Sequence, residues 1–108
     1  MGPQRSDLRN LHLHRAAVAK LIGSPALREP CLALVCKWLA AEELRGSRPY
    51  FERWRELLET ASDDELVRIV LDPERGQALR SCSPLGPVLT SKERWELLRE
   101  VDSGTVTT

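Results

Sequence analysis

The sequence has no uninterrupted apolar run near the roughly 18 residues that a membrane-spanning helix needs. Its first ten residues, MGPQRSDLRN, also lack the apolar core of a secretory signal peptide. These absences predict a protein that neither crosses a membrane nor is exported, and we expect it in the cytoplasm.

Cysteine and histidine are scarce, with three and two residues respectively, and neither a CxxC nor an HxxxH motif is present. Cys31 and Cys36 would stand about 140° apart around a helix, which is poor geometry for a disulfide between them. Without a metal-ligand spacing or a glycine-rich phosphate loop, we expect reduced thiols, no metal and no cofactor.

Net charge is also absent, because sixteen basic residues balance sixteen acidic ones. A neutral chain gives no global signal for nucleic-acid binding. Residues 1–28 nevertheless carry a local balance of +4. On a helix, four basic or partly basic side chains of this segment would fall within about 80° of one another; this basic stripe consists of Arg5, Arg9, His12 and Lys20. It is either a solvated face or a surface that follows a phosphate backbone.

No stretch of strand length alternates strictly between apolar and polar residues, so the sequence predicts an all-α fold. A chain of 108 residues suits one domain, which we expect over residues 1–101 with a disordered tail at 102–108. Five to six helices are expected in a compact bundle. The first covers about 6–22 and is capped by Ser6, and the second covers 25–41, with an interruption at Pro30 and a restart near Glu29. Pro49 opens the third, and the others are expected over 63–71, 73–80 (capped by Asp72) and 91–101.

Two capping boxes mark helix starts most clearly. Ser62 precedes Glu65, and Thr90 precedes Glu93, each by the three residues that let side chain and backbone bond reciprocally. The second box follows an uncharged loop, residues 81–90, in a chain that is 30% charged. We expect this loop, called the strap here, to pack across the core.

The segment from Cys31 to Ala41 contains Lys37 as its only charged residue and is apolar in nearly every direction. A helix of this kind is buried from more than one side. We therefore expect it to be the central helix of the domain or to be shared across a homodimer interface.

Arg15 and Arg94 fall on the apolar faces of their helices, and Arg80 directly precedes the strap. A buried guanidinium needs acceptors, so one interpretation is structural, with each arginine at the edge of the apolar face and bonded to a carboxylate or to strap carbonyls. Alternatively, the three arginines converge on a pocket for an acidic partner group. We expect Arg94 to brace the strap, so that Arg94→Ala would destabilise the domain by about 2–4 kcal/mol, and we expect Trp95 to be buried.

His14 lies at the flank of the apolar face of the first helix. General acid–base catalysis would require a nucleophile beside it, and Cys82 or Ser83 could supply one in principle. No spacing places these residues together, and Ser83 is not in a nucleophile-elbow motif. We interpret His14 as structural and the protein as non-enzymatic.

Several segments together resemble a group of small bacterial all-helical proteins found with helix-turn-helix regulators or in toxin–antitoxin-like settings. The most specific segment reads LR-x-x-SP-x-x-x-x-LT-x-x-ERW, from Leu79 to Trp95. Two positions depart from the pattern, Pro30 in an otherwise continuous helix and Leu85 where a larger aromatic is expected. The resemblance extends over about residues 11–101 and also includes Leu13-His14-Arg15-Ala16, Val18, Leu21, Ser24-Pro25-Ala26-Leu27, Trp38, Pro49-Tyr50, Trp54 and Leu57-Leu58.

This resemblance implies a regulatory or antitoxin-like role without catalysis. We therefore predict a helical interaction protein that masks a protein partner, with a small nucleic-acid-binding regulator using the basic stripe as the alternative. The predicted partner-binding residues are His14, Arg15, Arg80, Ser83, Arg94 and Trp95.

Overall fold

A computed structural model describes residues 5–104, and helices are the only regular secondary structure within that range. The prediction of an all-α bundle is confirmed. The radius of gyration is 13.7 Å, close to the roughly 13 Å of a folded chain of this length. The elements are α1 (Arg5–Gly23), η1 (Pro25–Leu27), α2 (Arg28–Leu39), η2 (Glu42–Ser47), α3 (Arg48–Thr60), α4 (Asp63–Val70), α5 (Gln77–Ser81), η3 (Gly86–Val88) and α6 (Ser91–Asp102), where η denotes a short 3-10 helix.

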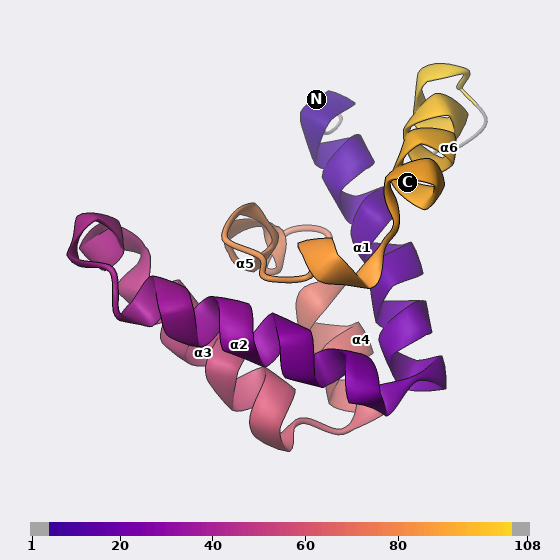
Figure 1. The fold of residues 1–108 in the computed structure, drawn as a ribbon. Coiled ribbons are helices and arrows are strands. Elements are labelled where there is room, and N and C mark those ends of the chain that lie inside the picture. Colours follow the sequence, from indigo (N-terminus) through magenta and orange to yellow (C-terminus); the bar gives the residue numbers. More distant parts are fainter. Residues whose placement is uncertain (1–4, 105–108) are drawn as a thin grey trace.

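The helices form two antiparallel pairs that diverge from a common corner (Figure 1). One pair is the hairpin of α2 and α3, and the other joins the first helix, α1, to the last, α6. The short helices α4 and α5 lie between the pairs and both contact α1. Among the described residues, no helix combines the length and the apolar character needed to cross a membrane.

The core is centred on Trp54, which is completely buried and donates a hydrogen bond from Nε1 to the Leu79 carbonyl at 2.8 Å. This bond links α3 to α5 through the only polar atom of the indole. The strap covers one side of the core with its apolar residues, as the sequence predicts: Pro84, Leu85 and Val88 are buried. The other fully buried large side chains are Leu21, Leu66, Val18, Val35, Val70 and Cys31.

The predicted helix starts are confirmed in detail at both capping boxes. Thr90 Oγ1 accepts the Glu93 N–H at 3.1 Å, and Glu93 Oε1 accepts the Thr90 N–H at 2.9 Å. Ser62 and Glu65 make the same reciprocal pair. Pro30 lies in the first turn of α2, where an N–H has no intrahelical acceptor and proline is therefore tolerated.

Helix boundaries differ from the expectations at three places. Helix α1 already includes Arg5, so Ser6 lies inside it and is not its cap. Asp72 accepts the N–H groups of Glu74 and Arg75, but this turn precedes α5, which begins only at Gln77. Helix α6 continues through Asp102, so the expected tail does not begin there, and residues 105–108 lie outside the described part of the chain.

The prediction that residues 31–41 form a central helix buried from more than one side is not confirmed. Only Cys31 and Val35 of α2 are buried, whereas Ala33, Cys36 and Lys37 are exposed. Helix α2 packs mainly along α3, which covers one of its faces and leaves small or charged side chains on another. Leu32, Leu34, Trp38 and Leu39 are half-buried, and the homodimer that the sequence suggested stays a prediction.

Candidate partner-binding site

A cavity of about 210 Å³ opens beside the strap, between α1, α5 and the start of α6. We call it the strap cavity. Four of the six predicted partner-binding residues line it, namely His14, Arg80, Ser83 and Arg94. The remaining lining residues are mostly apolar or small: Leu13, Ala17, Ser81, Leu85, Gly86 and Leu89.

His14 is buried, and its ring Nδ1 lies 2.7 Å from the Asn10 carbonyl oxygen. A carbonyl only accepts, so Nδ1 carries the proton and the neutral ring has its lone pair at Nε2. Burial lowers the pKa of His14 to about 4 against the opposing effect of the Asn10 hydrogen bond, and the nearby positive charge of Arg80 lowers it further. His14 is therefore neutral near pH 7, and its Nε2 has no partner among the described residues.

Arg80 is buried at 4% exposure and holds the turn after α4. Its Nη1 donates to the carbonyls of Val70 at 2.8 Å and Asp72 at 2.7 Å, and its Nη2 donates to Pro73 at 3.2 Å. Its Nε has no partner, and no carboxylate of the described chain pairs with the guanidinium. Desolvation lowers the Arg80 pKa, while the carboxylates of Asp7 and Asp72 act in the opposite direction from a distance.

Arg94 and Ser83 both line the cavity, and each bonds to a residue of the strap. Arg94 is exposed and donates from Nη2 to the Gly86 carbonyl at 3.2 Å. The predicted contact between Arg94 and the strap is therefore present, but at the surface and not in the core. Ser83 Oγ accepts the Leu85 N–H at 3.1 Å, which leaves its hydroxyl hydrogen able to donate.

Arg15 and Trp95 do not occupy the predicted positions. Arg15 is exposed, because the buried side of α1 runs through Leu11, His14, Val18 and Leu21 and leaves Arg15 beyond its edge. The expected convergence of three arginines is thus reduced to Arg80 and Arg94. Trp95, expected in the core, is 64% exposed, because α6 packs on α1 with a different face.

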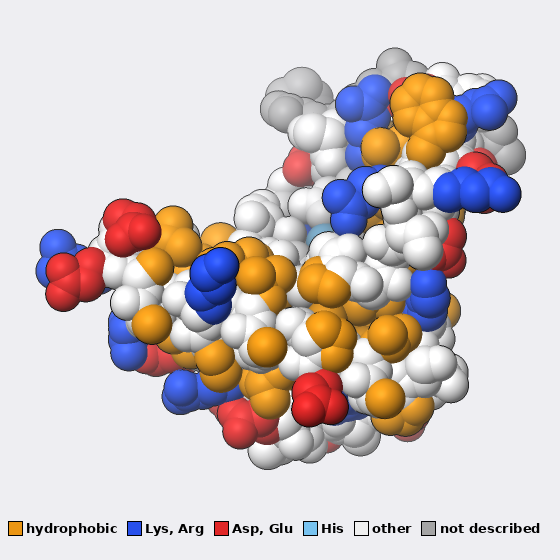
Figure 2. All heavy atoms as spheres, in the orientation of Figure 1, with side chains coloured by type: hydrophobic (Ala, Val, Ile, Leu, Met, Phe, Trp, Pro, Cys, Tyr) orange, Lys and Arg blue, Asp and Glu red, His pale blue; other side chains and the backbone are white. Residues whose placement is uncertain are grey.

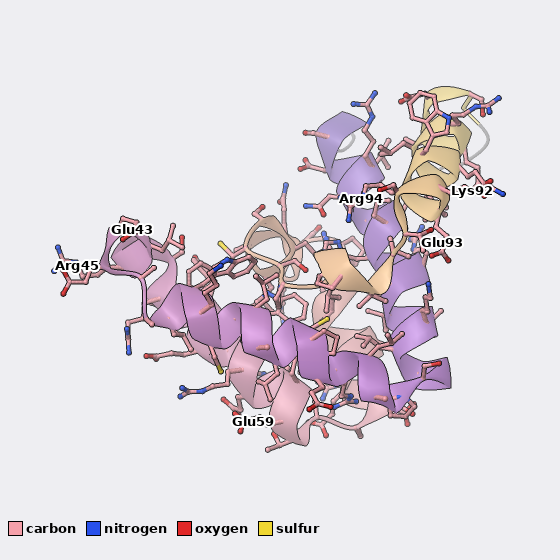
Figure 3. The ribbon with its side chains drawn as sticks, viewed as in Figure 1. Glu43, Arg45, Glu59, Lys92, Glu93 and Arg94 are labelled. Atoms are coloured by element: carbon pink, nitrogen blue, oxygen red, sulfur yellow. The ribbon has the colours of Figure 1, made fainter. Side chains whose placement is uncertain are left out.

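The exposed face of α6 carries Lys92, Trp95 and Arg99, which follow the i, i+3, i+7 spacing of one helix side. We call these three residues the α6 surface. Figure 2 shows a hydrophobic patch over α6 with lysine and arginine side chains on either side of it. Figure 3 places Lys92 and Arg94 on opposite sides of the helix, so the α6 surface and the strap cavity face different directions.

The acidic residues of α6 are largely neutralised by α1. Arg9 pairs with Asp102 at 2.7 Å, His12 with Glu100 at 2.8 Å, and Lys20 with Glu93 at 2.7 Å. The Lys20 bond, followed by the two capping contacts with Thr90, lowers the pKa of Glu93 to about 2. By contrast, Lys92 and Arg99 make no ion pair within residues 5–104.

The same three pairs occupy most of the predicted basic stripe. Arg9, His12 and Lys20 pair with α6 carboxylates at partly exposed positions, which reduces the positive potential on which phosphate binding would depend. The Arg5 side chain lies outside what the structure describes.

Sequence reasoning missed Lys92 and Arg99. Their helical spacing around Trp95 is visible in the sequence, but it becomes a binding signal only once the tryptophan is known to be exposed. No group of histidine, cysteine or acidic side chains in the described range could hold a metal ion, and the three cysteines there are free thiols. No protein-family model, curated protein or solved structure matches the chain.

Proposed function

We propose that this protein is a non-enzymatic interaction module whose α6 surface binds an acidic, amphipathic segment of a partner protein. The observation that carries this proposal is Trp95, a large aromatic residue at 64% exposure between two cations that have no ion pair in the described chain. Tryptophan and arginine are the residues that most often dominate binding energy at protein interfaces.

Charge complementarity supports an acidic partner. Lys92 and Arg99 carry two positive charges, and Glu96 at the edge of the same face carries one negative charge, so the surface is net positive. Of the other three acids of α6, Glu93 and Asp102 are balanced by Lys20 and Arg9, and Glu100 is bonded to His12. A carboxylate-rich segment with an apolar side chain could cover the indole while it neutralises both cations.

The role that the sequence resemblance implies, an antitoxin-like protein that masks an active partner, is one form of this function. Such masking requires a surface that can be fully covered, and α6 stands at the outer edge of its helix pair (Figure 1). The nucleic-acid alternative has less support, since α6 carboxylates bond to three of the four residues on which it depends.

A display selection with random peptides on the immobilised protein tests the proposal. We expect enrichment of acidic peptides that contain a large apolar residue. Trp95→Ala should weaken their binding by about thirtyfold or more, the effect of losing an interface hot spot. The double variant Lys92→Gln/Arg99→Gln should weaken binding and reduce its salt dependence.

Tyr50→Ala is the matched control, because Tyr50 is another exposed aromatic residue, 41% exposed, but lies on α3. Its binding should equal that of the unmodified protein. Peptides without acidic enrichment, or binding that is indifferent to Trp95, would contradict the proposal. Binding of fluorescein-labelled single-stranded DNA that depends on Trp95 and falls steeply with salt would instead assign the α6 surface to nucleic acid.

A further inference from the structure

The strap cavity combines two positive groups with an apolar wall and has no acidic lining residue. Arg80 lies on the α5 side and Arg94 on the α6 side, while Leu13, Leu85 and Leu89 supply apolar surface. This composition differs from that of the α6 surface, and the two sites share no residue. An inference about the cavity therefore does not depend on the proposed function.

Arg80 brings to the cavity a buried positive charge that makes no ion pair within the described residues, although Asp7 and Asp72 favour it from a distance. Its three hydrogen bonds all go to backbone carbonyls, and it has no carboxylate partner within the described residues although it is 4% exposed. Carbonyl dipoles satisfy donors but do not cancel a full charge in a poorly hydrated site. An anion in the adjoining cavity would be stabilised by this charge.

Arg94 supplies the donors that such an anion could reach. Of the five N–H donors of its guanidinium, only Nη2 makes a described bond, to the Gly86 carbonyl at 3.2 Å. The planar fork suits the two oxygens of a carboxylate. Ser83 can add a hydroxyl donor, because its oxygen already accepts from Leu85.

The volume limits the size of the ligand. A cavity of 210 Å³ corresponds to about seven water volumes. This space fits a carboxylate with a short branched apolar body. We propose that the strap cavity binds a small aliphatic carboxylate, with Arg94 holding the carboxylate group and Leu13, Leu85 and Leu89 packing against the apolar body.

Titration of the ¹⁵N-labelled protein with isovalerate, followed by NMR, tests this assignment. We expect saturable shifts of the Leu85, Gly86 and Leu89 amide signals. Isovaleramide, which has nearly the same shape but no charge, should bind at least about tenfold more weakly. Titration with N-acetyl-leucine distinguishes the source of the carboxylate, since tighter binding of this compound would identify the C-terminal residue of a peptide as the ligand.

Arg94→Gln should weaken isovalerate binding by about tenfold or more, because it removes a charge-assisted hydrogen bond from an exposed residue without disturbing the core. Arg68→Gln, which removes an exposed arginine from α4, should leave the affinity unchanged. An equal affinity for isovalerate and isovaleramide would overturn the proposal, as would shifts that do not saturate or an affinity that is unchanged in Arg94→Gln.

Discussion

Gly76 and Arg80 approach each other so closely that residue 76 can have no side chain. A Cβ atom at Gly76 would lie 2.6 Å from Arg80 Nη1, and it would also overlap the carbonyl oxygens of Val70 at 2.7 Å and Asp72 at 2.8 Å. These are the two oxygens to which Nη1 donates. The turn after α4 can therefore close around the guanidinium only because a glycine precedes α5.

Gly76→Ala should consequently destabilise the protein by about 1–3 kcal/mol, the usual effect of forcing a group into a packed site. Urea denaturation followed by circular dichroism would measure this change. Gly23→Ala provides the control, since no heavy atom lies within 4 Å of the position that a Cβ would take at Gly23. Equal stability of the two variants would show that the turn can open without loss.

Arg80→Ala should lower the free energy of unfolding by about 3 kcal/mol, because buried carbonyls lose a charged donor. Arg80→Lys should recover little of this loss, since an ammonium cannot reproduce a planar fork that reaches Val70, Asp72 and Pro73 together. Thermal unfolding of the two variants would provide the comparison. Full recovery by lysine would contradict the geometric explanation.

Arg94→Ala should cost less than about 1 kcal/mol, because its one described bond is made at an exposed position. The larger loss expected from the sequence assumes a buried guanidinium, and the observed exposure removes that assumption. Parallel urea titrations of Arg94→Ala and Arg80→Ala would separate the two roles. A loss as large as that of Arg80→Ala would restore the interpretation of Arg94 as a buried brace.

Acid should destabilise the fold through His14. The pKa of a histidine is ordinarily 6.5, and that of His14 in the folded protein is about 4. Between these pH values the unfolded chain therefore binds a proton at His14 that the folded protein does not. The contribution of His14 to the free energy of unfolding is fully present above about pH 6.5. It is lost as the pH falls towards 4, and the total loss is about 3 kcal/mol. Denaturation curves across this range would measure the loss. His14→Leu should remove most of it, whereas His12→Gln should retain it.

The predictable parts of the fold are those determined by neighbouring residues. Thr90 and Glu93 fix the start of α6 through contacts within one turn, and Pro30 fixes where α2 resumes. The packing of the uncharged strap on the core is predictable because its composition alone disfavours full exposure. Four residues of the strap cavity follow from the same local patterns.

The incorrect predictions concern contacts between helices. A helical pattern shows that Trp95 shares a broad arc with Leu97, Leu98 and Val101, but it does not show which part of that arc meets α1. The observed packing buries Val101 and leaves Trp95 outside. The convergence of Arg15 on a pocket with Arg80 and Arg94 is not found for the same reason, since the position of the neighbouring helices, and not its spacing, determines its exposure.

The ribosome synthesises α1 first and α6 last, yet the ion pairs of Arg9, His12 and Lys20 all join these two helices across 73 to 93 positions of sequence. While the chain is still being made, α1 thus presents three unmatched polar groups and an apolar face whose covering is incomplete. The hairpin of α2 and α3 depends on neighbours in sequence and can assemble earlier. The α1–α6 pair can therefore form only after both segments, more than 70 positions apart, have been synthesised.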